Sequence, residues 1–208
     1  MSDFTLENEL ISQGYKTICG IDEAGRGPFA GPVCASAVIL PVGCQIKDLD
    51  DSKKIKSEKK RQILFEEVTK NAIDYGISMV HHDEIDEIGI LPATFKAMRQ
   101  AVKQLKTKPD YLLVDGNLYR NFDDYAGRFV IGGDGLSLSI SGASILAKVT
   151  RDNYMNEQAL IYPQYEFEKN KGYGGSKAHQ NALLEYGPCK IHRMFYLRKF
   201  REKHNCNW

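Results

Sequence analysis

The chain has 208 residues, of which 42% are hydrophobic and 26% charged, and its 28 Lys and Arg nearly balance its 27 Asp and Glu. A chain of this length can bury a sizeable core, and its composition excludes a disordered, collagen-like or coiled-coil protein. The net charge of +1 also excludes a protein that holds nucleic acid by bulk charge alone.

Cysteine usage and the opening residues predict the compartment. The five cysteines are scattered and include no C-x-x-C pair, so neither a disulfide framework nor a structural zinc site is favoured. No basic segment followed by an apolar run opens the sequence, and no apolar stretch approaches the ~20 residues that cross a bilayer. We therefore expect a cytoplasmic protein with no membrane partner.

The first half of the chain predicts a hairpin followed by a helix and a third strand. Two apolar runs flank a turn-forming Gly-Arg-Gly-Pro sequence, which indicates a strand, a structured loop and a second strand. A charged stretch with apolar residues at helical spacing follows, with Ser57 as its predicted N-cap. The predicted elements are strands at 17–22, 33–40 and 73–80 and a helix at 57–71.

The second half alternates helices with strands and then changes composition. A stripe of Phe95, Met98, Val102 and Leu105 predicts a helix with one face against the sheet. The remaining predicted elements are strands at 111–114 and 128–131 and helices at 139–159, 176–186 and 194–204. This order indicates an α/β or α+β sheet with a helical C-terminal addition that begins at residue 163.

Four acidic residues stand where a predicted strand ends or a Gly-rich loop begins: Asp22, Glu23, Asp115 and Asp134. Carboxylates brought together are costly unless a positive group lies between them. Oxygen ligands of this kind suit Mg²⁺, and Mn²⁺ would also fit. The alternative is that each aspartate caps a helix or closes a turn, as Asp before Gly commonly does.

Other chemistries lack their sequence signatures. The sequence contains no Walker-type phosphate loop, no G-x-S-x-G nucleophile motif and no H-E-x-x-H zinc motif. His81 and His82 are interpreted as polar residues at a strand end. His179 and His192 each read as a hydrogen-bonded structural residue unless another feature assigns them a role.

Basic and aromatic residues mark two segments for contact with phosphates. A basic run includes Lys53, Lys54 and Lys56, and the C-terminal third is also basic; such residues supply affinity without sequence preference. The alternative for the first run is a solvated helix face. Among the nearby aromatic residues, Tyr173 lies between glycines and is predicted to be exposed, where it could stack on a sugar or base.

Several motifs, taken in order, resemble the ribonuclease HII family, the bacterial type 2 ribonucleases H. The opening signature GIDEAGRGP at 20–28, continued by AGPV at 30–33, is highly specific for it. The resemblance continues to residue 193 through DSKK at 51–54, VDGN at 114–117, GD at 133–134, SILAKVTRD at 144–152, KGYG at 171–174 with His179, YGP at 186–188, and HR at 192–193.

The resemblance implies a fold and an activity. The fold would be ribonuclease H-like, a mixed five-stranded sheet flanked by helices, with a catalytic core at 1–162 and a C-terminal helical segment at 163–208 that grips the duplex. The activity would be an endonuclease that cuts the RNA strand of RNA/DNA hybrids and nicks duplex DNA 5′ to embedded ribonucleotides. It would use two Mn²⁺ or Mg²⁺ ions and leave 3′-hydroxyl and 5′-phosphate ends.

The resemblance also assigns residue roles. The catalytic, metal-binding carboxylates carry over to Asp22, Glu23, Asp115 and Asp134. Gly25, Arg26 and Gly27 would sense the ribose 2′-hydroxyl, because glycine lets backbone approach it closely, and Tyr173 would stack on the deoxyribose after the junction. The further substrate-binding residues implied are Ser52, Lys53, Lys54, His179 and Arg193.

Two positions depart from the family pattern. Many members have a lysine where this chain has Gly132, and a proline commonly follows the tyrosine where this chain has Gly174. The first departure removes a positive charge near the predicted metal site, and the second affects the approach of the Tyr173 ring. Neither changes the four carboxylates.

Two alternative functions are weighed against this one. A nucleic-acid-binding protein that has lost catalysis is disfavoured by the intact carboxylate set, and an enzyme restricted to long hybrids would leave the ribose-sensing loop and Tyr173 without a role. The substrates expected are RNA/DNA hybrids and DNA duplexes that contain ribonucleotides. The chain is expected to act as a monomer, and a replication clamp is a candidate partner.

Overall fold

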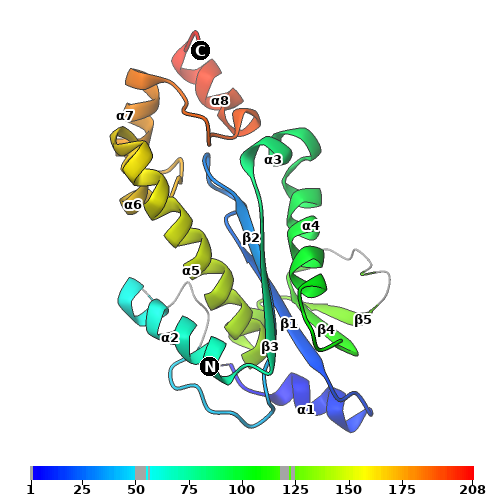
Figure 1. Cartoon of the computed structure of the whole chain (residues 1–208). Coiled ribbons are helices and arrows are strands. Elements are labelled where there is room, and N and C mark those ends of the chain that lie inside the picture. The colour runs from blue at the N-terminus through cyan, green and yellow to red at the C-terminus, as the bar shows by residue number, and fades with distance from the viewer. Residues whose placement is uncertain (1, 50–54, 56, 118–121, 123–124) are drawn as a thin grey trace.

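A mixed five-stranded sheet forms the centre of the molecule (Figure 1). The computed structural model describes residues 2–49, 55, 57–117, 122 and 125–208. Its strands, in chain order, are β1 (Ile18–Ala24), β2 (Val33–Ile39), β3 (Asp74–Val80), β4 (Tyr111–Asp115) and β5 (Ala126–Val130). They lie in the order β3-β2-β1-β4-β5, with β1 antiparallel to β2 and parallel to β4. The predicted hairpin and mixed sheet are confirmed.

Helices cover the sheet and extend beyond it. They are α1 (Thr5–Ser12), α2 (Glu58–Asn71), α3 (His82–Ile88), α4 (Ile90–Lys103), α5 (Leu138–Ile161), α6 (Phe167–Asn170), α7 (Lys177–Tyr186) and α8 (Met194–His204), with short 3₁₀ turns η1 (Gly133–Gly135) and η2 (Pro163–Tyr165). The structure adds α1, α3 and α6 to the predicted helices. His81 and His82 directly follow the end of β3, as predicted for polar residues at a strand end; His81 is the N-cap of α3 and His82 its first residue.

The face of the sheet that packs against α4 is built from alternate strand residues. Cys19 and Ile21 of β1 join the apolar cluster of this face, because successive strand residues point to opposite sides. From α4, Phe95, Met98 and Val102 are buried in the same cluster, and Leu105 packs against it. The predicted apolar stripe is confirmed.

The opposite face packs against α5, which Figure 1 shows on the other side of the sheet from α4. Small residues at the start of α5, including Gly142 and Ala143, allow a close approach, and Ser36 of β2 donates a hydrogen bond to the Ala143 carbonyl at 2.6 Å. A Cβ on Gly20 of β1 would lie 2.2 Å from the carbonyl carbon of Ser139. This contact sets β1 directly against the first turn of α5.

The C-terminal helices share a core with the end of α5. Tyr165, Phe167, Leu183 and Leu197 are buried in one cluster with Met155 of α5. No helix in the described part of the chain is both long enough and apolar enough to span a membrane. The boundary at residue 163 stays a prediction, because this cluster includes residues from both sides of it.

Candidate active site

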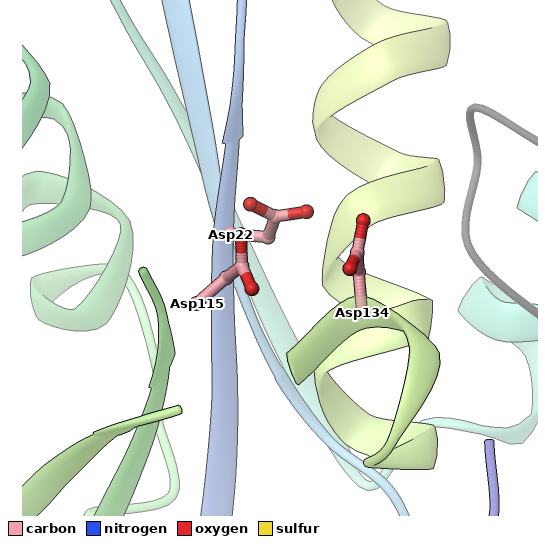
Figure 2. Close-up of side chains that lie close together, drawn as sticks. All are labelled: Asp22, Asp115 and Asp134. Carbon is pink, nitrogen blue, oxygen red and sulfur yellow. The ribbon is translucent and has the colours of Figure 1, made fainter. Parts of the chain in front are cut away.

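Three aspartates meet beside the neighbouring strands β1 and β4 (Figure 2). Asp22 lies in β1, Asp115 ends β4 and Asp134 lies in η1. One carboxylate oxygen from each lies within 4.8 Å of the other two. Asp22 and Asp134 are buried, and Asp115 is half-buried. Residues separated by more than a hundred positions therefore form one compact group of oxygen donors.

The sheet register and the start of α5 place the three side chains. Because β1 and β4 are parallel neighbours with Ile21 opposite Val114, the residues that follow each, Asp22 and Asp115, lie side by side. The η1 turn is tied to this pair, since the Gly133 amide donates to Asp115 Oδ1 at 2.7 Å. The hydroxyl of Ser141 in α5 donates to the carbonyl oxygen of Asp134.

Electrostatics of the group favour a bound cation. Burial raises the pKa of Asp22 well above its usual value, and the nearby carboxylates of Glu23 and Asp115 raise it further. Hydrogen bonds from Ser144 and from the Glu23 amide, which lies 2.7 Å from Asp22 Oδ1, lower this pKa in part. A hard divalent ion would remove the repulsion between these oxygens, and it prefers oxygen ligands. The donor set thus fits Mg²⁺ or Mn²⁺.

Glu23 is next to Asp22 in β1 but is not part of the compact group of three aspartates. Neighbouring residues of a strand point to opposite faces, and Glu23 lines a small hollow that also includes Thr94 and Phe95 of α4. Its carboxylate accepts a hydrogen bond from Arg26 Nη1 at 3.2 Å. The structure therefore brings together three of the four carboxylates expected from the sequence, with Glu23 on the rim.

Asp22 and Asp115 open into a cleft of about 520 Å³. The loop that follows β1 lines this cleft, and so does Tyr173 of the C-terminal segment, which is 44% exposed. The lining residues of the cleft are Asp22, Glu23, Ala24, Gly25, Arg26, Gly27, Ile90, Asp115, Ser144, Lys148, Tyr173 and Tyr196. The predicted exposure of Tyr173 is confirmed.

The loop after β1 has a backbone that only glycine adopts readily. Gly25 has φ +93°, and a Cβ there would lie 2.1 Å from Nε of Arg151. Arg151 is buried and donates through Nε to the Pro32 carbonyl and through Nη2 to the Ala30 carbonyl. The Arg151 guanidinium thus packs against Gly25 and fixes the chain that follows the loop at Ala30 and Pro32, while the loop itself lines the cleft.

Comparisons with known proteins identify the family. The family model for Ribonuclease HII matches residues 19–200. A Ribonuclease HII of Endomicrobium trichonymphae is 50% identical over 193 residues, which cover 93% of this chain and 91% of that protein. The chain belongs to the ribonuclease HII family. It is a metal-dependent endoribonuclease that hydrolyses RNA in RNA/DNA hybrids.

Solved structures confirm the ribonuclease H-like fold. Ribonuclease H2 from Pyrococcus horikoshii OT3 has a TM-score of 0.70 and 24% identity, covering 92% of this chain and all of that one. RNase HII from Archaeoglobus fulgidus, solved in a complex with PCNA, has a TM-score of 0.71 and 22% identity, covering 86% and 94%.

Two residues of this ribonuclease HII that were expected to bind substrate lie beneath the surface of the cleft. His179 and Arg193 are both fully buried, so neither side chain presents surface to a duplex. His179 contacts the Tyr173 carbonyl through Nδ1 at 3.1 Å, and Arg193 donates to the Gly25 carbonyl at 2.6 Å. Both residues support the segments that line the cleft.

Three expected residues lie outside the described part of the chain, and one residue of the cleft was not predicted from the sequence. Ser52, Lys53 and Lys54 lie outside the described residues. Lys148 lines the cleft and pairs with Asp152 at 2.7 Å; the i, i+4 spacing of this pair was the available sequence signal. Lys148 supplies a cation to the cleft of a chain that lacks the common lysine at position 132.

The structure shows the surroundings of Gly132 and Gly174, the two positions that depart from the family pattern. Gly132 has φ +65° and precedes η1 in the left-handed region. A Cβ on Gly174 would lie 2.3 Å from the ring of Phe29. A proline at position 174 would therefore require Phe29 to move, which accounts for glycine here.

Proposed function

We propose that this ribonuclease HII also nicks duplex DNA on the 5′ side of a single embedded ribonucleotide, leaving 3′-hydroxyl and 5′-phosphate ends. One observation carries the proposal: Asp22 and Asp115, the Gly25–Gly27 loop and Tyr173 line the same open cleft. A single duplex could therefore contact the metal-binding carboxylates, the loop and the tyrosine at once.

We assign Asp22, Asp115 and Asp134 as metal ligands and catalytic residues, with Glu23 as a fourth ligand from the rim. The oxygen-only set supports Mg²⁺ or Mn²⁺. These carboxylates would hold two such ions, which would supply a lowered pKa to the attacking water and positive charge to the leaving 3′ oxygen. The carboxylates position the ions and do not attack the phosphate themselves.

Recognition of the RNA-to-DNA step is assigned to the loop and the tyrosine. The Gly25–Gly27 backbone can approach a 2′-hydroxyl closely, since a Cβ on Gly27 would meet open space and the Gly25 carbonyl is held by Arg193. The exposed ring of Tyr173 can stack on a sugar that lacks this hydroxyl. Specificity would arise from one hydroxyl on one side of the step and its absence on the other.

Contacts with the rest of the duplex are assigned to basic residues. In the C-terminal segment, α8 exposes Arg198, Lys199, Arg201 and Lys203, which suits phosphate contacts with strong salt dependence. Ser52, Lys53 and Lys54 stay predicted phosphate contacts. We further propose a cytoplasmic monomer with a replication clamp among its partners, which the PCNA complex of the Archaeoglobus fulgidus protein supports.

The test is cleavage of an end-labelled DNA duplex that carries one ribonucleotide, with Mg²⁺, Mn²⁺ or EDTA. An all-DNA duplex and a long RNA/DNA hybrid are the matched substrates. We expect a single metal-dependent nick 5′ to the ribonucleotide. Cleavage of the hybrid alone would refute the roles of Gly25, Arg26, Gly27 and Tyr173, and binding without any cleavage would refute the metal site.

Two variants separate chemistry from recognition. Asp115→Asn should keep the circular dichroism spectrum and reduce cleavage of both substrates by several orders of magnitude, because a ligand is weakened where transition-state charge is stabilised. Tyr173→Ala should reduce nicking at a single ribonucleotide more than general duplex binding. Unchanged turnover in Asp115→Asn would contradict the assignment.

A further inference from the structure

Two adjacent C-terminal residues, His192 and Arg193, lie between the two recognition elements of the cleft. Their segment pairs with the chain after the Gly25–Gly27 loop: the Gly31 amide donates to the Ile191 carbonyl at 2.9 Å, and the Arg193 amide donates to the Phe29 carbonyl at 2.8 Å. Neighbouring side chains of an extended segment point in opposite directions. His192 and Arg193 can therefore support different partners.

Arg193 supports the loop. It is fully buried, and its three guanidinium nitrogens donate to three backbone carbonyls, those of Gly31 at 2.9 Å, Arg26 at 3.0 Å and Gly25 at 2.6 Å. The hydroxyl of Tyr196 donates to the same Arg26 carbonyl at 2.8 Å. A planar fork of fixed donors thus sets the position of the loop backbone, which a single ammonium group could not do.

His192 supports Tyr173 through His179. The Cys189 amide donates to His192 Nδ1 at 2.9 Å, and the Nε2 atoms of His192 and His179 lie 2.9 Å apart. His179 Nδ1 lies 3.1 Å from the Tyr173 carbonyl oxygen, which can only accept. These partners determine every proton: His192 carries its proton on Nε2 and donates to His179 Nε2, and His179 donates from Nδ1.

The surroundings keep this chain of hydrogen bonds neutral. Both imidazoles are buried and packed against the rings of Tyr165 and Phe167. Burial lowers the pKa of both histidines, that of His192 to about 3. The donor order is therefore retained at neutral pH.

The backbone of Tyr173 is fixed by hydrogen bonds, and its ring is exposed. Its amide donates to the Asn170 carbonyl at 3.0 Å, and the preceding Lys171 carbonyl accepts from Arg151 at 3.1 Å. The guanidinium of Arg151 also lies 5.9 Å from the centre of the ring. The position of the ring in the cleft thus depends on the hydrogen bonds that fix its backbone.

We infer that His179, His192 and Arg193 are positioning residues that fix the spacing between the Gly25–Gly27 loop and the Tyr173 ring, and thereby set the preference for a ribonucleotide followed by a deoxyribonucleotide. The inference rests on the proposed function, because it concerns how the cleft selects that step. All three side chains are buried beneath the cleft, so they act through the loop and the ring.

The test compares two substitutions of one residue. The amide of His179→Asn can occupy the place of Nδ1 and keep the hydrogen bond to the Tyr173 carbonyl, whereas the longer His179→Gln reaches the place of Nε2 and loses it. We expect His179→Gln to reduce nicking at a single ribonucleotide about tenfold more than hybrid cleavage, the effect of one lost hydrogen bond. His179→Asn should retain most of the preference. Equal losses on both substrates in both variants would overturn the inference.

A double-mutant cycle separates positioning from general destabilisation. In a Tyr173→Ala background there is no ring to position, so His179→Gln should not change the ratio of the two activities further. Arg193→Lys acts on the loop, which is still present in this background, so it should still lower the ratio there. A full additional loss of the ratio on His179→Gln in the Tyr173→Ala background would show that His179 acts elsewhere.

A spectroscopic measurement does not depend on nicking. Nitrogen-detected NMR of the imidazoles at neutral pH should show His179 protonated on Nδ1 and His192 protonated on Nε2. The opposite tautomers would overturn the inference whatever the nicking assay shows. If the wild-type chain cleaves hybrids but does not nick at a ribonucleotide, the proposed function fails, and the tautomers still decide whether the hydrogen-bonded chain exists.

Discussion

Replacing one metal ligand should stabilise the metal-free protein while abolishing its activity. In Asp22→Asn the amide can still accept the hydrogen bond from the Glu23 amide, but it carries no charge. At 4.8 Å, the upper limit of the distances between these carboxylate oxygens, two charges repel by about 3.5 kcal/mol at an effective dielectric constant of 20. Because proton uptake already avoids part of this cost, we expect the free energy of unfolding to rise by about 1–3 kcal/mol.

The sign of the pH dependence provides the critical check. The folded-state pKa of Asp22 lies above its unfolded value of about 3.8. As the pH rises from that value through the folded-state pKa, the unfolded state loses its proton first, so the wild-type protein loses stability relative to the variant. The stabilisation by Asp22→Asn should therefore be absent near pH 3.8, grow as the pH rises and then level off.

Thermal unfolding in EDTA at low salt measures this effect. The Tm should rise by about 2–4 °C per kcal/mol for a chain of this size. Asp152→Asn is the matched control, because Asp152 is buried beside Lys148 and Arg61 at 2.7 and 3.6 Å and its neutralisation should destabilise the protein. A lower Tm for Asp22→Asn at neutral pH, or a difference that does not change with pH, would refute the reasoning.

Three further predictions concern metal binding, packing and acid stability. Mn²⁺ at a hundred times its Kd should raise the free energy of unfolding of the wild-type protein by about 2.7 kcal/mol, and calorimetry should show most of this gain absent in Asp134→Asn. Gly20→Ala should destabilise the protein by about 3 kcal/mol or more in urea unfolding, because the new Cβ would lie 2.2 Å from the carbonyl carbon of Ser139; a smaller effect would show that α5 moves easily. The pKa of His192 is about 3 in the folded protein and about 6.5 in the unfolded chain. Protonation therefore favours the unfolded state as the pH falls from 6.5 to 3. Stability should then fall by up to about 1.4 kcal/mol per pH unit, and urea titrations at several pH values should show this slope weakened in His192→Gln.

Elements with a strong apolar pattern could be predicted from the sequence. The stripe from Phe95 to Leu105 and the uninterrupted strand ending at Asp115 both have the predicted structure. The short helices α1 and α3 were missed, because α3 buries only Ile85 and so has no periodic pattern. Tertiary contacts stabilise such short helices, and a pattern within one segment does not report those contacts.

The candidate site was predictable in composition and less so in geometry. Strand ends identified Asp22 and Asp115, yet the sequence did not show that Glu23 would turn towards Arg26. His179 and Arg193 were expected at the substrate and are buried instead. Local sequence reports the type of a side chain, whereas burial depends on segments distant in the chain, such as Phe29 to Gly31 against Ile191 to Arg193.

The pairing of Arg193 with the Gly25–Gly27 loop affects the order in which the protein can become functional during synthesis. The donor to the Gly25 carbonyl is Arg193, which lies 168 residues later in the chain. The three aspartates, in contrast, have all been translated by residue 134. A nascent chain that has exposed its sheet and α5 therefore has its acidic cluster before its loop acquires the arginine beneath it. The capacity to bind metal precedes the capacity to discriminate, and the ribosome must release the C-terminal segment before both exist in one molecule.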